Sequence, residues 1–118
     1  MQTDMYEVPI STGSAAAARA YRTGQHRLLG AEACMVDAFE ESITHDPGFA
    51  LGHAGLARAR QFSGDVAGAK SAMAQARGLT GGVTDREAGH IHALGHLIDG
   101  RPPVALAAIR AHVDLYPR

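Results

Sequence analysis

Aromatic side chains are scarce in this sequence. It contains no tryptophan, and aromatic residues make up only 5 % of its 118 residues. We therefore expect a core built from the side chains of Ala, Leu, Ile, Val and Met. Because small side chains let helices approach one another closely, this composition favours tightly packed helices over a fold with large internal cavities.

Cysteine is almost absent as well. Cys34 is the single cysteine of the chain, which excludes an intramolecular disulfide and a metal site built from several thiolates. Its neighbours Ala33, Met35 and Val36 are apolar. We therefore expect Cys34 to be a buried small hydrophobic residue, the commonest environment of a free cysteine.

The chain also lacks an excess of charge of one sign and any long apolar run. Its formal net charge of −1 does not provide the basic surface that nucleic-acid binding draws on. No uncharged apolar segment approaches the ~18 residues that a membrane span needs, and the opening MQTDMYEVPI has no apolar stretch of signal-peptide length. We expect a soluble cytoplasmic protein that binds neither nucleic acid nor membrane.

What the sequence does contain is a repeated spacing of residues that end helices. Three glycines each stand seventeen residues before a proline or another glycine, namely Gly30 before Pro47, Gly64 before Gly81 and Gly100 before Pro117. Glycine suits a tight turn between two helices, and either residue suits the stop after the second helix. A recurrence at 34 to 36 residues is typical of helix-hairpin solenoids. The sequence predicts an all-α, right-handed superhelix of about three antiparallel helix hairpins, with six helices.

The predicted domain organisation follows from these turns. An extended N-terminal arm over 1–13 precedes a helical repeat domain over 14–118, whose units lie at about 14–47, 48–82 and 83–118. Helix starts carry capping residues: Ser14, Asp65, and Thr84 with Glu87, which form a capping box. The six expected helices run approximately over 14–29, 31–45, 49–62, 65–79, 84–99 and 102–116.

The second unit resembles the tetratricopeptide repeat (TPR). The resemblance rests on a large apolar residue, a small residue, a Gly-Asp turn and then small and bulky apolar residues at intervals of four and three: Leu56, Ala57, Gly64, Asp65, Ala69, Met73 and Ala76. The first unit matches at Gly30, Phe39 and Pro47, and the third at Gly100, Ala105, Ile109 and Pro117. Segments 46–54 and 84–90 are similar to the opening of the tetratricopeptide repeat protein 38 family. The resemblance implies a TPR-like solenoid, with this chain as the N-terminal part of a larger one.

No pattern for catalysis is present. A nucleophile elbow, a phosphate-binding Gly-Lys-Ser/Thr loop and a dinucleotide-binding glycine fingerprint are all missing. The sequence therefore predicts neither an enzyme nor a cofactor. His92 and His96 are four apart on one predicted helix, a spacing that suits two metal ligands, but no third ligand is evident. The alternative is that both histidines pack where the repeat usually buries Leu or Tyr.

Charge is unevenly distributed between the helices. The opening helices of the first two units carry arginines and no acidic residue, whereas the closing helix of the first unit carries four acidic residues and no Lys or Arg. In TPR-like solenoids the opening helices line the concave surface. Projection of the repeat places four side chains nearest a basic groove: Arg27, Arg58, Gln61 and His90. The alternative is that these arginines are solvated surface.

We therefore expect a protein or peptide interaction module that binds acidic segments in this groove. The final predicted helix presents an apolar face, with Val104, Ile109 and Tyr116 as candidates for self-association or for contact with the remainder of a longer solenoid. A different class of function stays open: a small-molecule or metal-handling helical domain, accessory to an enzyme, that uses the face of His92 and His96.

Overall fold

A computed structural model describes residues 2–116, with the side chains of Pro102, Val104 and Ala105 outside the description. The chain is 71 % helical, which confirms the all-α prediction. The α-helices are α1 (Ala15–Leu29), α2 (Met35–His45), α3 (Ala50–Phe62), α4 (Val66–Gly78), α5 (Asp85–Ile98) and α6 (Pro102–Leu115). A short 3-10 helix, η1 (Thr80–Gly82), follows α4. None of the described helices is long and apolar enough to cross a membrane.

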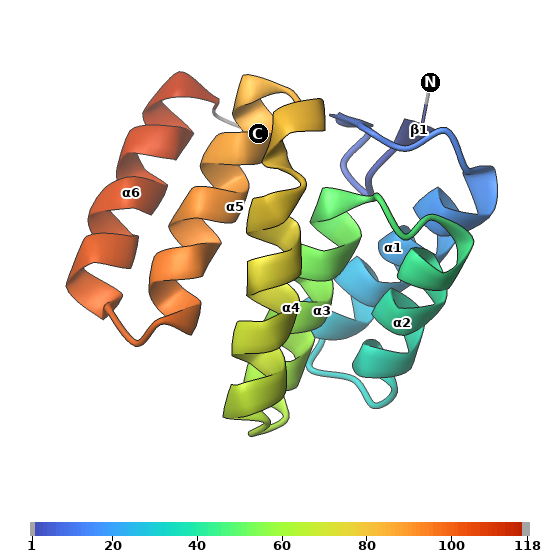
Figure 1. Ribbon diagram of the computed structural model, residues 1–118, viewed down its shortest axis with the longest axis horizontal. Helices are drawn as coiled ribbons and strands as arrows, with labels where there is room; N and C mark the ends of the chain where they lie inside the picture. Colours follow the sequence, from blue (N-terminus) through green and yellow to red (C-terminus); the bar gives the residue numbers. More distant parts are fainter. Residues whose placement is uncertain (1, 117–118) are drawn as a thin grey trace.

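Neighbouring helices pack as three hairpins, α1 with α2, α3 with α4, and α5 with α6 (Figure 1). The pair α3 and α4 lies between the other two pairs, and the opening helix α3 contacts both α1 and α5. The helices α1, α3 and α5, one from each pair, therefore lie side by side.

The turns inside the hairpins fall where the glycines predict them. Gly30 is the first residue after α1, while Gly64 and Gly100 are the second residues after α3 and α5. Gly64 has a φ of +87° and Gly100 a φ of +74°, values in the left-handed region that glycine adopts at little cost. These two turns therefore require glycine for its backbone freedom.

The predicted helix starts are confirmed as well. The Ser14 hydroxyl accepts a hydrogen bond from the amide of Ala17 at 3.0 Å, and the Asp65 carboxylate accepts one from the amide of Gly68 at 2.9 Å. Thr84 and Glu87 form the expected capping box at the start of α5. These side chains satisfy amide groups that have no partner within the first turn of a helix.

The start of α2 differs from the prediction. This helix begins at Met35 rather than Ala31, because the first turn is longer than one glycine and both Ala31 and Cys34 adopt positive φ values of 52° and 65°. Cys34 is exposed, so the expectation of a buried thiol was wrong. Its apolar neighbours suggested burial, but Cys34 lies in the turn, outside the face that α2 turns toward the core.

Phe39 of α2 holds the first two units together. Its ring is 1 % exposed and lies against Gly24 of α1 and Gly55 of α3. A Cβ atom at Gly24 would lie 2.7 Å from the ring, closer than such atoms approach in real structures, and one at Gly55 would come closer still. Tyr21 packs edge-on against the same ring, with centroids 5.8 Å apart. The two missing side chains create the space that a large ring fills.

The N-terminal arm folds back on itself. Two short antiparallel strands, β1 (Gln2–Thr3) and β2 (Pro9–Ile10), pair with Gln2 opposite Ile10 and Thr3 opposite Pro9. Ile10 is buried in the core, at 5 % exposure. The sequence predicts an extended arm over 1–13 and no strand. The hairpin depends on contacts with α1 and α5, which no local pattern reveals.

The contact between Phe39 and Gly55 leads to a stability prediction. We expect Gly55→Ala to lower the free energy of unfolding by about 1–3 kcal/mol, because the added methyl group would lie closer to the buried Phe39 ring than real Cβ atoms approach other atoms. Gly78→Ala is the matched control. Nothing lies within 4 Å of a Cβ at this exposed position at the end of α4, so this change should be neutral or slightly stabilising. Urea unfolding followed by circular dichroism measures both, and equal effects would contradict the packing described.

Candidate binding cleft

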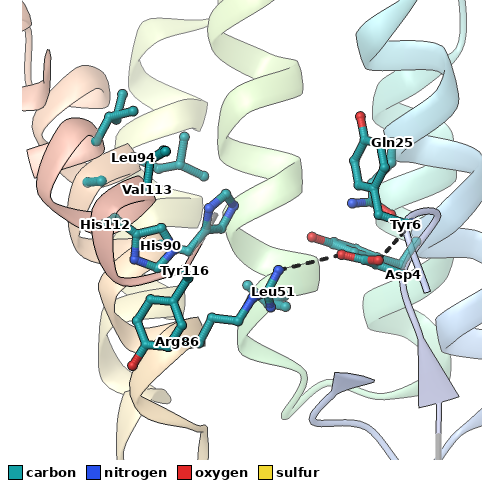
Figure 2. Close-up of a pocket in the computed structure, with 13 residues that line it drawn as sticks. Asp4, Tyr6, Gln25, Leu51, Arg86, His90, Leu94, His112, Val113 and Tyr116 are labelled. Carbon is teal, nitrogen blue, oxygen red and sulfur yellow. Dashed lines mark hydrogen bonds and ion pairs between the residues drawn. The ribbon is translucent and has the colours of Figure 1, made fainter. Parts of the chain in front are cut away.

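A cleft lies between the first and third helix pairs, with α3 behind it (Figure 2). Its main cavity has a volume of about 320 Å³. Most of the side chains around it are apolar or aromatic, and they come from the N-terminal arm, α1, α3, α5 and α6: Asp4, Tyr6, Tyr21, Gln25, Leu51, Arg86, His90, Ala93, Leu94, Ile109, His112, Val113 and Tyr116. The three opening helices thus share one concave site.

A second cavity of about 350 Å³ continues the cleft toward the first unit. The two cavities share five lining residues, Tyr6, Tyr21, Gln25, His90 and Leu94. The second cavity adds Leu28, Phe39 and Arg58 among others. Arg58 therefore belongs to one end of the cleft and Arg86 to the other, with apolar surface and the two shared tyrosines between them.

An ion pair crosses the cleft. A guanidinium nitrogen of Arg86 on α5 lies 3.8 Å from the Oδ2 atom of Asp4 in the arm, and Figure 2 shows the two side chains reaching toward each other from opposite walls. The Oδ1 atom of Asp4 accepts hydrogen bonds from the amides of Tyr6 and Val8, at 2.8 and 3.0 Å. The Asp4 carboxylate thus stabilises the loop of the arm and also forms the ion pair with Arg86 of α5.

A buried carboxylate anchors the base of the arm to α5. Glu87 is fully buried, and it accepts hydrogen bonds from the amide and hydroxyl of Ser11 at 3.0 and 2.5 Å and from the hydroxyl of Thr84 at 3.0 Å. Burial alone would raise its pKa, but the hydrogen bonds from Ser11 and Thr84 outweigh this, and the pKa of Glu87 lies below its usual value. The carboxylate is therefore ionised at neutral pH, and both of its oxygens accept hydrogen bonds.

Two histidines in the cleft are held neutral. Burial, with smaller contributions from the nearby His112 and Arg86, lowers the pKa of His90 to about 4, while Asp4 acts in the opposite direction. Burial and Arg86 also lower the pKa of His112, whose ring centroid lies 6.0 Å from that of His90. At pH 7 both rings offer one N–H donor and one acceptor, without charge.

Tyr21 contributes a second kind of neutral polar group. Its side chain is 5 % exposed and lines both cavities. Burial raises the pKa of the Tyr21 phenol, and the Asp4 carboxylate raises it further. The hydroxyl therefore stays protonated, and among the described lining residues the fixed charges are those of Asp4, Arg58 and Arg86.

The structure brings together some of the predicted groove residues and separates others. Arg58 and His90 both line the second cavity. Gln61 accepts a hydrogen bond from Arg58 at 2.6 Å and donates one to the carbonyl of Leu97 on α5 at 3.1 Å, so it positions Arg58. Arg27 turns away from the cleft and donates to the carbonyl of Cys34 at 3.0 Å.

Two charged residues of the cleft were missed by sequence reasoning. Arg86 lies between Thr84 and Glu87, the two residues of the capping box, so the pattern around it was interpreted only as the start of a helix. Asp4 belongs to an arm whose folding back could not be predicted. Their sequence separation of 82 residues leaves no periodic signal, so the pairing becomes visible only once the first and third units are placed together.

The histidine pair lies outside the cleft, beside the joint between α4 and α5. The Nε2 atoms of His92 and His96 are 3.2 Å apart, and the rings meet edge-on with centroids separated by 4.6 Å. Within the described part of the chain, no group of three or more potential metal ligands is found. The Nδ1 atom of His96 is buried and has no hydrogen-bond partner among the described residues.

The self-association candidates have different environments. Ile109 and Tyr116 line the cleft, and Tyr116 packs against His112 with ring centroids 5.1 Å apart. The side chain of Val104 lies outside the described residues. The most exposed large apolar side chains of α6 include instead Leu106 at 49 % and Leu115 at 74 %, and neither of them lines the cleft.

No family model, curated protein or solved structure matches this chain. The resemblance to tetratricopeptide repeats therefore stays a prediction, and a function for the chain has to be inferred from the geometry and charges of the cleft.

The neutral state of His90 leads to a pH prediction. Its pKa is lower in the folded protein than in the unfolded chain, so the unfolded chain takes up the proton first as the pH falls. Stability should be fully present above about pH 6.5 and should decline toward pH 4, by about 3 kcal/mol over that window.

Urea unfolding at several pH values measures this decline. His90→Leu should make the profile flatter between about pH 6.5 and 4.5, whereas His26→Gln, a change at an exposed position of α1, should leave the slope as it is. A profile of His90→Leu that parallels the wild-type profile would show that His90 is not held neutral in the cleft.

Proposed function

We propose that this chain is a protein or peptide interaction module of the TPR-like type, and that it binds a partner segment in the cleft between its first and third helix pairs. The observation that carries the proposal is a concave site, lined by all three opening helices, with an apolar centre and a guanidinium group at each end. A site of this kind combines anchoring pockets with charges that fix the orientation of a ligand.

The charges favour an acidic partner. Arg58 is held by a neutral amide, since its hydrogen-bond acceptor is the Oε1 atom of Gln61. Arg86 meets the single carboxylate of Asp4 at a distance of 3.8 Å, which is longer than a charge-assisted hydrogen bond. A ligand carboxylate that approached either guanidinium closely would gain such bonds. A basic ligand would instead face two like charges.

The arrangement of the helices supports the TPR-like part of the proposal. In helix-hairpin solenoids, each unit contacts its neighbours and the opening helices line a shared concave surface. Here α3 contacts both α1 and α5, and the cleft draws residues from all three. A right-handed superhelix that continues beyond three units would extend this surface. The exposed free thiol of Cys34 suits a reducing compartment such as the cytoplasm.

The role of Arg58 is tested by charge reversal. We expect Arg58→Glu to weaken binding of a fluorescein-labelled peptide of alternating Glu and Phe by about tenfold, a loss of ~1.4 kcal/mol, and to reduce the salt dependence of binding. Arg27→Glu is the matched control, because it makes the same charge change outside the cleft. Fluorescence anisotropy measures both affinities.

Two results would contradict the proposal. One is binding of the Glu–Phe peptide that no cleft substitution alters. The other is equal binding of a Lys–Phe peptide of the same length, since the arginines would then make no contribution to selection. If Arg27→Glu weakened binding as much as Arg58→Glu, the basic surface that contacts the peptide would include α1 outside the cleft.

A second candidate function rests on the histidine pair. Two imidazole nitrogens bound to one tetrahedral Zn²⁺ lie about 3.3 Å apart, given metal–nitrogen distances of ~2.0–2.1 Å. The Nε2 atoms of His92 and His96 already lie 3.2 Å apart. A divalent metal could replace the proton that they share, with water or a partner completing the coordination.

Metal titration distinguishes this candidate. If the pair is a metal site, the full chain binds one equivalent of Zn²⁺ by calorimetry, and His92→Ala abolishes binding while His53→Ala, a change on α3, does not. Failure of the unaltered chain to bind Zn²⁺, or equal binding after His92→Ala, would leave His92 and His96 as a packed polar pair.

A further inference from the structure

The N-terminal arm places an acidic and an aromatic side chain against the cleft. Asp4 pairs with Arg86, and Tyr6, two residues later, lines both cavities. We infer that the tip of the arm, which lines the cleft, competes with the partner segment for Arg86, and that this partner segment has the same chemistry: a carboxylate for Arg86 followed closely by an aromatic side chain. This inference rests on the proposed function and names the partner that the cleft selects.

The tip of the arm is held as a preformed loop. The Oδ1 atom of Asp4 accepts hydrogen bonds from the amides of Tyr6 and Val8, and the amide of Asp4 donates to the carbonyl of Val8 at 2.9 Å. Glu7 adopts a positive φ of 62° to close the turn. The loop therefore presents Asp4 and Tyr6 in one fixed geometry, as a bound peptide segment would present its anchoring residues.

The base of the arm is anchored by hydrogen bonds and by packing in the core. At the base, Ser11 makes two hydrogen bonds to the buried Glu87 and Ile10 enters the core. At the tip, Asp4 is 6 % exposed, and the links include two part-buried hydrogen bonds to α1, from Met5 to Gln25 and from Arg22 to Thr3, and the long ion pair to Arg86. The tip can leave the cleft while the base keeps the chain in place.

The cleft offers more to an acidic and aromatic segment than the arm takes up. A guanidinium group has five N–H donors in a planar fork that suits both oxygens of one carboxylate. Arg86 meets Asp4 through one long contact. His90 and His112 add neutral N–H groups nearby, and the apolar walls next to Tyr6 suit an aromatic ring. A partner segment that filled the cavity could therefore displace the tip.

Charge distribution separates this partner from its alternatives. A basic segment would approach both Arg58 and Arg86, and an aliphatic segment without a carboxylate would leave the Asp4–Arg86 pair in place. The arm itself carries acidic residues at Asp4 and Glu7 and no basic residue between Gln2 and Ile10. The segment already seated beside the cleft thus has the composition that the arginines favour.

The experiment uses the full chain and a fluorescein-labelled peptide with the sequence of residues 2–10, QTDMYEVPI. Asp4→Asn removes the charge that pairs with Arg86 and keeps an Oδ1 acceptor for the two loop amides. We expect this variant to bind the peptide about fivefold more tightly than the unaltered chain, because competition from the attached arm is weaker. Glu7→Gln is the matched control, with the same loss of charge in the same loop, and its affinity should stay within about twofold.

Two further measurements keep the result interpretable. In the Asp4→Asn background, Arg86→Gln should abolish peptide binding, while thermal unfolding by circular dichroism confirms that both variants fold. Because the chain contains no tryptophan, Tyr6→Trp introduces a single reporter at the tip. Tyr6 is 49 % exposed, so a small shift of the emission to the red is expected when excess unlabelled peptide drives the tip fully into solvent.

The outcomes separate this inference from the proposed function. Equal affinity of the unaltered chain and Asp4→Asn, or an unchanged emission from the Tyr6→Trp variant at saturating peptide, would show that the arm does not compete and would overturn the inference. Binding of the Glu–Phe peptide without any binding of the 2–10 peptide would also overturn it, while the proposed function would stand. Failure of both peptides would remove the cleft itself as a binding site.

Discussion

The cleft depends on one buried carboxylate. Glu87 caps α5 through Thr84 and at the same time holds Ser11 of the N-terminal arm, so the beginning of the chain is tied to the third helix pair. A buried charge is costly unless its hydrogen-bonding capacity is filled, and here both oxygens have donors. The requirement to satisfy Glu87 therefore fixes the base of the arm across the molecule, and the wall that contains Asp4 and Tyr6 depends on that attachment.

The spacing of the helices is set by a different constraint. Phe39 fills the space left by Gly24 and Gly55, which brings α2 close to both α1 and α3. Tyr21 completes this packing by contacting Phe39 and Phe49 edge-on, with centroids 5.8 and 5.2 Å away. Because Tyr21 also lines both cavities, the same ring belongs to the core and to the floor of the cleft. Changes to the core of the first unit would thus alter the shape of the binding surface.

The sequence predicted the features that depend on short-range chemistry. Turns at Gly64 and Gly100 require backbone conformations that glycine adopts readily, and the caps at Ser14 and Asp65 involve atoms three residues apart. Such local patterns can be recognised in the sequence without knowledge of the tertiary structure. This is why the number of helices and most of their ends could be predicted, while the length of the first turn, with two non-glycine residues at positive φ, could not.

Only some residues of the candidate site could be predicted from the sequence. Projection of the repeat chose Arg58 and His90, and both line the second cavity, because helical periodicity determines which face of a helix a residue occupies. It also chose Arg27, whose side chain turns to a carbonyl in the adjoining turn. Asp4 and Arg86 were missed, and the second role of Glu87 was hidden behind its obvious capping role. Long-range pairs of this kind leave no spacing to detect.

The electrostatics of the cleft explain how it could select a partner while remaining largely apolar. Burial keeps His90 and His112 uncharged and the Tyr21 phenol protonated, so the middle of the cleft provides hydrogen-bonding groups without fixed charge. Among the described residues that line the cleft, the positive charges are those of Arg58 and Arg86 at the ends, and Asp4 offsets the second of these. In the proposed binding mode, a ligand without a carboxylate would leave the Asp4–Arg86 pair in place and would gain no contact with Arg86. Under the proposed function, a segment that brings its own carboxylate could replace Asp4 as the partner of Arg86.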